Sequence, residues 1–480
     1  MSVGGEGSVG QVGLEREGES ADSEKRGNPG PTNILKVRDD VRPSEFVRRE
    51  DDQFESKEGL APFRDSDRFA TADLRRYIEP WLTSLFQSDH LTALIGSGLT
   101  TAIEVAAGAN KNDAMQSARF TTHGERIKEV SDESACKAGR SSPNLEDEIR
   151  TASQLLRGLQ ILGDSTAAAL EGEIDSTLKK FADSILGGER ALLVVRDEAR
   201  TQAFTMLVSF LMSFASRTGS RDRLGIFTTN YDRLIEMGAE LAGLHLLDRF
   251  VGTISPVFRS SRLDLDLHYN PPGIRGEPRF VEGVARFTKL HGSLDWVSIG
   301  ADIRRIGLPF GAKEIQPYLE EPGLSGASAN SLMIYPNAAK DRETAEYPYV
   351  ELFRDFAAAV VRPNSTIVTY GYSFGDEHIN RVLRDALTIP SAHLVVISYS
   401  DPLGRIRKMY EEWGRSSQIS LLVGPDLADI ESLTTHYLPK PSIDLASRRM
   451  GDLLRQRYEA PSVETTGSDN PSSANRGGTQ

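Results

Sequence analysis

Two hydrophobic patterns alternate along the middle of the chain. Apolar residues recur at helical spacing from Asp73 to Phe86, and a short continuous apolar run follows from Leu91 to Ile95. Such runs and helical patterns then alternate strictly, which predicts strand 366–370, helix 377–387, strand 393–398, helix 402–413, strand 419–423 and helix 428–437. Continuous apolar strands that alternate with helices are typical of a parallel sheet covered on both faces. The pattern therefore predicts an α/β fold with a doubly wound, Rossmann-like parallel sheet.

The remaining pattern divides the chain into segments. Residues 1–68 mix charges with Gly, Pro and Ser, which predicts a disordered N-terminal tail. The sheet domain is expected over 69–109 and 216–440, interrupted at 110–215 by a polar linker and an inserted helical subdomain. A C-terminal helix over 441–458 and a disordered tail over 459–480 follow.

Inside the second part of the sheet domain, we expect further strands at 224–228, 286–290 and 332–335 and helices at 231–242 and 347–361. Residues 294–298 are predicted to form a hairpin with strand 286–290. The Pro- and Gly-rich stretch 251–282 predicts a long loop near the site.

Composition narrows the classes of partner. The net charge is -13 and the pI is about 5.3, so nucleic acid is not indicated as a partner. The single cysteine, Cys136, suits a reducing compartment. The first 30 residues lack a signal peptide, and the longest apolar run, 203–215, would span only about 20 Å as a helix, short of a bilayer. We therefore expect a cytoplasmic protein with no membrane segment.

Four predicted strands run directly into polar residues, at the ends where an α/β sheet presents its chemistry. The segments are Leu94–Thr100, Phe227–Leu234, Lys289–Ser293 and Thr369–His378. Four such strand ends can converge on one ligand.

The glycine-rich segment has two readings. Gly96-Ser97-Gly98 permits a tight turn before a helix whose free backbone amides suit phosphate, but similar turns merely connect a strand to a helix. The full GxGxxG spacing is missing, and no acidic residue ends the next strand to bind a ribose. Both features disfavour a dehydrogenase.

The other polar residues also have structural alternatives. His291 is placed as a general base, or is a satisfied structural histidine. His378 lies where a helix begins and can cap it. Asn230 and Asp232 can reach one crevice, although Asn230 alone also reads as a helix N-cap. The remaining histidines show no metal-ligand spacing, so no metal site is predicted.

Taken in order, the four segments resemble the motifs of the sirtuin-like superfamily. They are similar to its divergent bacterial branch, whose motifs read GxGxS/T, TTNYD, KLHGS and GYSFxDxH, and the resemblance runs from roughly residue 91 to residue 440. It implies that NAD lies across a doubly wound sheet.

By this resemblance, each motif residue carries an expected role. The phosphates would be bound by the first turn, through Gly96, Ser97, Gly98 and Thr100. Asn230 would orient water and the nicotinamide-side ribose, and Asp232 would lie near the nicotinamide amide. His291 would be the catalytic histidine, and Ser373 would lie near phosphate and ribose. Less closely, residues 398–401 and 424–426 correspond to the surroundings of the adenosine.

The chain also departs from protein-deacylating sirtuins. Those enzymes carry four zinc cysteines and an Asp, Phe and Arg run soon after the first glycines, whereas this chain has one cysteine and reads Thr101-Ala102-Ile103-Glu104 there. We therefore expect no zinc module, and deacylation is disfavoured.

Without a platform for acyl-lysine, water is the remaining nucleophile. Cleavage of an N-glycosidic bond needs a held ribose, a neutral leaving group and a base beside the attacking water. The expected activity is that of an NAD+ glycohydrolase, with NAD as the substrate and no metal. The alternatives are an NAD-dependent protein deacylase or ADP-ribosyltransferase, and a non-catalytic nucleotide-binding assembly module.

The same resemblance implies a biological setting. Members of this branch resemble effectors of anti-phage defence, in which NAD depletion stops the infected cell in an abortive infection. The chain ends about 22 residues after its last predicted helix, so sensing is expected from a partner, from self-assembly or from the insertion. A homo-oligomer and a HerA-type ATPase partner are therefore expected.

Overall fold

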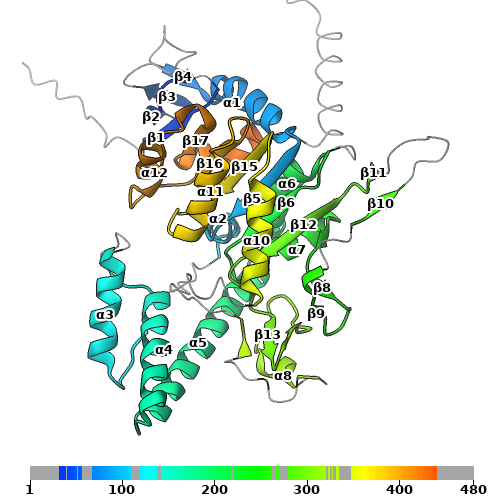
Figure 1. Cartoon of the computed structure of the whole chain (residues 1–480). Helices are drawn as coiled ribbons and strands as arrows, with labels where there is room; N and C mark the ends of the chain where they lie inside the picture. Colours follow the sequence, from blue (N-terminus) through cyan, green and yellow to red (C-terminus); the bar gives the residue numbers. More distant parts are fainter. Residues whose placement is uncertain are drawn as a thin grey trace, which may run out of the picture.

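The computed structural model describes most of the chain between residues 32 and 440 (Figure 1). The described residues are 32–38, 40–50, 52–56, 68–109, 118–137, 142–217, 221–261, 266–269, 279–320, 323–324, 327, 331–333 and 347–440. The predicted C-terminal helix over 441–458 and the tail over 459–480 lie outside them, as do residues 1–31.

A large sheet forms the centre of the described structure. Its order is β4-β3-β2-β1-β17-β16-β15-β5-β6-β12-β7. The strands are β1 (Thr32–Lys36), β2 (Ser44–Glu50), β3 (Gln53–Ser56), β4 (Arg68–Ala70), β5 (His90–Ile95), β6 (Gly225–Thr228), β7 (His245–Leu247), β12 (Val284–Lys289), β15 (Ser365–Tyr370), β16 (His393–Ser398) and β17 (Ile419–Val423).

The seven strands from β17 to β7 are parallel, and the chain order reverses between β5 and β15. A parallel sheet of this kind binds ligands at the carboxyl ends of its strands, beside the point of reversal. The predicted doubly wound, Rossmann-like sheet is confirmed.

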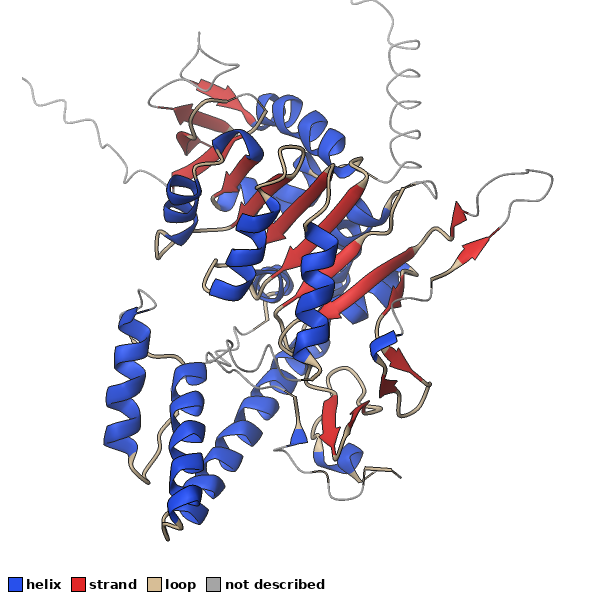
Figure 2. Ribbon diagram, in the orientation of Figure 1, coloured by secondary structure: helices blue, strands red, loops and turns tan. Residues whose placement is uncertain are grey.

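Helices cover both faces of the sheet (Figure 2). One face packs on α1 (Thr71–Phe86), α2 (Gly98–Ala107), α6 (Asp197–Ala215), α7 (Leu234–Ala242) and the short turns α13 (Pro425–Ala428), α14 (Ile430–Ser432) and η5 (Leu433–Tyr437). The other face packs on α10 (Tyr349–Val360), α11 (Glu377–Ala386) and α12 (Arg405–Trp413), with η4 (Ser416–Gln418) before the last strand. Continuous apolar strands are explained by this burial on both sides.

The N-terminal segment corrects a prediction. Residues expected to be a disordered tail instead form β1, β2 and β3, and β1 pairs antiparallel with β17. Phe46, Phe54 and Phe69 cluster with ring centroids 5.3–5.7 Å apart, and each is at most 4% exposed. A few aromatic side chains on one face give this segment a core that its polar average composition concealed.

The inserted helical block contains α3 (Gly124–Lys137), α4 (Leu145–Leu162) and α5 (Ala167–Val194), which share a hydrophobic core. Helix α6 was predicted inside the insertion, but its buried side chains Leu207, Phe210 and Phe214 belong to the core of the sheet domain. The insertion therefore ends before α6. The apolar run 203–215 is a buried helix, and no helix in the described residues is long and apolar enough to cross a membrane.

A small second sheet replaces the predicted hairpin. Its order is β13-β14-β9-β8, with strands β8 (Phe250–Val251), β9 (Val257–Phe258), β13 (Trp296–Ile299) and β14 (Asp302–Arg305). In the described part of the chain, strand β13 pairs antiparallel with β14 and lies in a different sheet from β12. The short helix α8 (Gln316–Leu319) lies beside this sheet, and β10 (His268–Tyr269) and β11 (Arg279–Phe280) form a separate hairpin.

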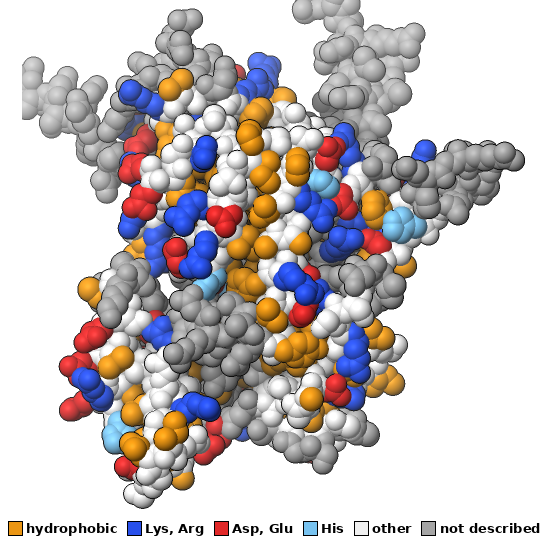
Figure 3. Space-filling model, viewed as in Figure 1, with side chains coloured by type: hydrophobic (Ala, Val, Ile, Leu, Met, Phe, Trp, Pro, Cys, Tyr) orange, Lys and Arg blue, Asp and Glu red, His pale blue; other side chains and the backbone are white. Residues whose placement is uncertain are grey.

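Charge is mixed over the face shown in Figure 3. Lys and Arg side chains lie among Asp and Glu side chains, with apolar side chains between them. This face therefore presents no extended surface of a single charge.

Candidate active site

The predicted strand ends converge on one cavity of about 810 Å³. This volume lies within the range of about 300–1,000 Å³ that small-molecule sites occupy. Seven of the eight predicted site residues line it: Gly96, Ser97, Thr100, Asn230, Asp232, His291 and Ser373. The opposite wall comes from α3, α4 and α5 of the insertion, through residues such as Ser134, Arg150 and Phe181. The cavity therefore lies between the sheet and the helical block.

The glycines of the first turn serve close backbone packing. A Cβ atom on Gly98 would lie 2.5 Å from the Cα atom of Gly371, and one on Gly96 would lie 2.5 Å from the Gly371 carbonyl oxygen. The Gly98 amide donates to that carbonyl at 3.1 Å. Gly98 is the predicted site residue that does not line the cavity, because it holds together the two loops that flank the point of chain reversal.

The Asn230 side chain is held by its amide nitrogen. Nδ2 donates to the Gly96 carbonyl at 3.1 Å and to the Thr100 hydroxyl oxygen at 3.2 Å. Asn230 is 6% exposed, and its Oδ1 atom is buried without a hydrogen bond. Because an unsatisfied buried acceptor costs about 1–3 kcal/mol, this oxygen indicates that the cavity takes a ligand or water with a hydrogen-bond donor.

Asp232 has two structural contacts. Its Oδ2 accepts a hydrogen bond from the Thr100 hydroxyl at 2.8 Å, and its Oδ1 accepts one from the Leu234 amide at 3.0 Å. Asp232, and not Asn230, therefore satisfies an amide at the start of α7. The interpretation of Asn230 as a helix N-cap is wrong, and its side chain faces the cavity instead.

His291 pairs with a buried carboxylate. Its Nε2 atom lies 3.0 Å from Asp376 Oδ2, and the two residues are 9% and 8% exposed. Since a carboxylate can only accept, Nε2 carries the donated proton and Nδ1 is the basic nitrogen of the neutral ring. This contact fixes the orientation of the ring.

Asp376 is the main residue that the sequence reasoning missed. Its Oδ1 atom also accepts from the His378 amide at 3.1 Å, so Asp376 is the N-cap of α11. The predicted cap, His378, instead donates its own backbone N–H and lines the cavity. An aspartate just before a helix reads as an ordinary cap, which is why the pattern gave no sign of its contact with His291.

The insertion is joined to the site by a buried ion pair. Glu189 on α5 accepts hydrogen bonds from the Arg233 backbone amide at 3.0 Å and from its guanidinium Nη2 at 2.5 Å. Their side chains are 2% and 7% exposed. Burial disfavours the charged guanidinium, but the contact with Glu189, together with the negative charges of Asp295 and Glu236, outweighs burial and raises the pKa of Arg233. Helix α5 is thereby tied to the loop that carries Asn230 and Asp232.

The correspondences further along the chain have mixed outcomes. Ser373 lines the cavity and is exposed. Residues 398–401 and 424–426 do not line it. Asp426 instead accepts from Asn33 Nδ2 at 2.7 Å and pairs with Arg48 at 2.6 Å, so the segment 424–426 contacts the N-terminal strands. Residues 251–254, 256 and 258 of the stretch 251–282 line a different cavity.

Within the described ranges, no group of three or more His, Cys, Asp or Glu side chains is placed to hold a metal ion. Cys136 is exposed at the end of α3. The predicted site residues that line the cavity include the Asn230 amide, the His291 imidazole and the Asp232 carboxylate.

Comparison with known proteins agrees with this geometry. Residues 224–421 match the family model for a SIR2-like domain, a range that includes β6, β12, β15 and β16 and the residues from Asn230 to Asp376. No curated protein matches the chain. The match supports a sirtuin-like family and NAD-related activity in general. The Gly96 turn lies outside the matched range but joins the same cavity.

Proposed function

We propose that this protein hydrolyses NAD+ to nicotinamide and ADP-ribose. The observation that carries the proposal is the buried Oδ1 atom of Asn230, which makes no hydrogen bond in a cavity that also contains the His291–Asp376 pair. An acceptor fixed in place beside a base is what a positioned water molecule or ribose hydroxyl requires.

In the proposed reaction, the bond between the ribose C1 atom and the nicotinamide nitrogen breaks, and both electrons leave with neutral nicotinamide. A water oxygen forms the new bond to C1. Asn230 Oδ1 accepts a hydrogen bond from that water or from a ribose hydroxyl, and His291 takes up the proton that the water loses. The balance is NAD+ plus water to nicotinamide, ADP-ribose and one proton.

Asp376 strengthens the proposed base. A negative carboxylate 3.0 Å from Nε2 favours the protonated imidazole that forms as the water loses its proton. Thr100 and Asp232 help to hold the Asn230 side chain in place, since the Thr100 hydroxyl contacts both Asn230 and Asp232. The proposal therefore assigns proton transfer to one strand end and positioning to two others.

We further propose that the activity serves anti-phage defence by depleting NAD, in a homo-oligomer and with a HerA-type ATPase as partner. The Glu189–Arg233 pair supports a role for the insertion, because any displacement of α5 by a partner would pull on the loop of Asn230. Such a link would let a partner that binds the insertion change the position of Asn230.

The experiment expresses the chain with its genomic neighbours, infects the cells and follows NAD and nicotinamide. We expect NAD to fall and nicotinamide to rise with the wild type and with His268→Ala, a matched control on the exposed strand β10. Asn230→Ala and His291→Ala are expected to abolish the change. Equal NAD loss in these two variants would refute the proposal.

Other outcomes point to the alternatives. Nicotinamide release with ADP-ribose attached to a protein would indicate an ADP-ribosyltransferase, and release coupled to loss of an acyl group would indicate a deacylase. Constant NAD with a normally assembled wild-type protein would indicate an assembly module.

A further inference from the structure

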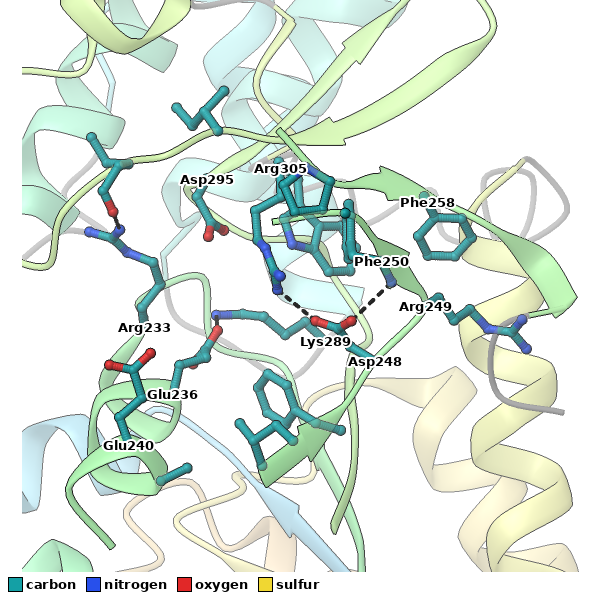
Figure 4. Close-up of a pocket in the computed structure, with 18 of the residues that line it drawn as sticks. Arg233, Glu236, Glu240, Asp248, Arg249, Phe250, Phe258, Lys289, Asp295 and Arg305 are labelled. Carbon is teal, nitrogen blue, oxygen red and sulfur yellow. Dashed lines mark hydrogen bonds and ion pairs between the residues drawn. The ribbon is translucent and has the colours of Figure 1, made fainter. Parts of the chain in front are cut away.

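A second cavity lies beside the candidate active site and is separate from it. It measures about 710 Å³ and lies between α7, the ends of β7 and β12, and the small sheet (Figure 4). The two cavities share Phe310, but neither Asn230 nor His291 lines the second one. It therefore requires its own explanation.

The cations around this cavity already have partners. Arg305 pairs with Asp248 at 2.6 Å, and Lys289 pairs with Glu236 at 2.9 Å. Arg233 is held by Glu189 on the side of the insertion. The Arg249 guanidinium points away from the cavity and pairs with Asp355 at 2.5 Å (Figure 4).

Two carboxylate oxygens in the cavity are left without hydrogen bonds. Asp295 is 8% exposed, has no ion pair among the described residues, and its Oδ1 atom makes no hydrogen bond. Glu236 Oε2 is likewise buried and unsatisfied. Figure 4 shows the Asp295 carboxylate directed toward the open centre of the cavity. A buried carboxylate without an ion pair is costly, so this end of the cavity favours a hydrogen-bond donor that carries positive charge.

The walls define the rest of the ligand. Phe250 and Trp296 lie with ring centroids 4.9 Å apart, and Phe287, Leu247 and Leu308 complete an apolar lining. Two unsatisfied carboxylate oxygens are too few to enclose a bare metal ion, and no larger group of ligands is present in the described residues. An organic cation with an apolar body satisfies both the acidic end and the apolar walls.

We propose that this second cavity binds a small organic cation, a primary amine or guanidine on a short aliphatic chain, with its charged end against Asp295 and Glu236. The site adjoins the active-site loop, because the Lys289 ammonium donates to the backbone carbonyl of Asp232. The proposal does not depend on NAD hydrolysis, and its test uses no NAD.

The protonation state of Glu236 should make the affinity of this cavity for a cation depend on pH. Burial raises the pKa of Glu236 to about 7, with Asp295 acting in the same direction and Lys289 opposing it. The other charged groups that line the cavity are Arg233 just before α7, Glu240 on α7, Asp248 and Arg249 between β7 and β8, and Arg305 on β14, and the titratable His245 lies at the start of β7. Because Glu236 loses its proton between about pH 6 and pH 8, affinity for a cation should rise over that interval.

The test is calorimetric titration of the full chain with agmatine and with 1,4-diaminobutane at pH 8. We expect saturable binding to the wild type, at least tenfold weaker binding to Asp295→Asn, and weaker wild-type binding at pH 6. Glu240→Gln, which neutralises an exposed carboxylate on the same cavity, is the matched control and should bind within threefold of the wild type. 1-Butanol, which has a similar chain without the charge, should not bind.

Folding of the variants is checked by thermal unfolding. Asp295→Asn removes a buried charge without a partner and should leave the melting temperature unchanged or raised. Glu236→Gln provides a second variant, in which the rise of affinity between pH 6 and pH 8 should disappear. No saturable binding of either amine, or equal binding by wild type and Asp295→Asn, would overturn the proposal and indicate a cavity filled by water alone.

Discussion

Replacement of Asp376 by Asn separates the two contacts of this side chain. Asn retains an oxygen that can accept from the His378 amide, and Asn and Asp are about equally good N-caps. The change removes the negative charge that lies 3.0 Å from His291 Nε2. The fold and the cap should therefore survive while the histidine loses its charged partner.

The size of the effect follows from the contact. A hydrogen bond to a charged group contributes about 1.5–3 kcal/mol, and both partners are buried, so solvent does not screen it. Since about 1.4 kcal/mol corresponds to a factor of ten in rate, kcat should fall about 10- to 150-fold. KM for NAD should change little, because the pair acts on the proton transfer and not on ground-state binding.

The assay is steady-state nicotinamide release by wild type and Asp376→Asn over a range of pH. Asp429→Asn is the matched control, because Asp429 caps α14 by accepting from the Glu431 and Ser432 amides at 3.1 and 3.2 Å and does not line the cavity. It should keep full activity. An unchanged kcat in a folded Asp376→Asn variant, or a loss confined to KM, would refute the role assigned to this pair.

Three further predictions concern stability. Gly98→Ala places a Cβ atom 2.5 Å from the backbone of Gly371 and should lower the free energy of unfolding, measured by chemical denaturation, by about 1–3 kcal/mol. Gly187→Ala in α5, where a Cβ atom would meet nothing within 4 Å, should raise it by about 0.5–1 kcal/mol. Equal effects of the two substitutions would contradict the packing described. Glu189→Gln leaves Arg233 buried without its charged partner and should lower the free energy of unfolding by about 3–5 kcal/mol. Glu129→Gln, which removes one partner of an exposed ion pair, should lower it by less than about 0.5 kcal/mol. The pKa of Glu236 in the folded protein is about 7, above its ordinary value of 4.5. As the pH rises from about 4.5 to 7, the free energy of unfolding of the wild type should therefore fall by about 1–3 kcal/mol relative to that of Glu236→Gln. Parallel pH dependence of the two proteins would disprove this.

The sequence predicted the parallel sheet well because its strands are buried on both faces. The runs at 393–398 and 419–423 have the same bounds as β16 and β17. The convergence of Asn230, His291 and Ser373 followed from a rule of topology, since the carboxyl ends of parallel strands lie along one edge.

Other features depend on contacts between distant residues and left no periodic signal. Strand β1 is short, and it is stabilised by pairing with β17 nearly 400 residues away, from Ile34 to Val423. Helix α6 has the same apolar pattern whether it covers the insertion or the sheet, so its place was decided by packing. The contacts of Asp376 with His291 and of Glu189 with Arg233 also join separate segments, and a single sequence does not reveal such pairs.

Hydrolysis of NAD by water is measured directly when protein recovered from infected cells is incubated with NAD in water enriched in oxygen-18. We expect one nicotinamide for each free ADP-ribose, with one atom of oxygen-18 in the ADP-ribose, and neither product with Asn230→Ala or His291→Ala. Intact NAD with active wild-type assemblies, or nicotinamide without free labelled ADP-ribose, would contradict it.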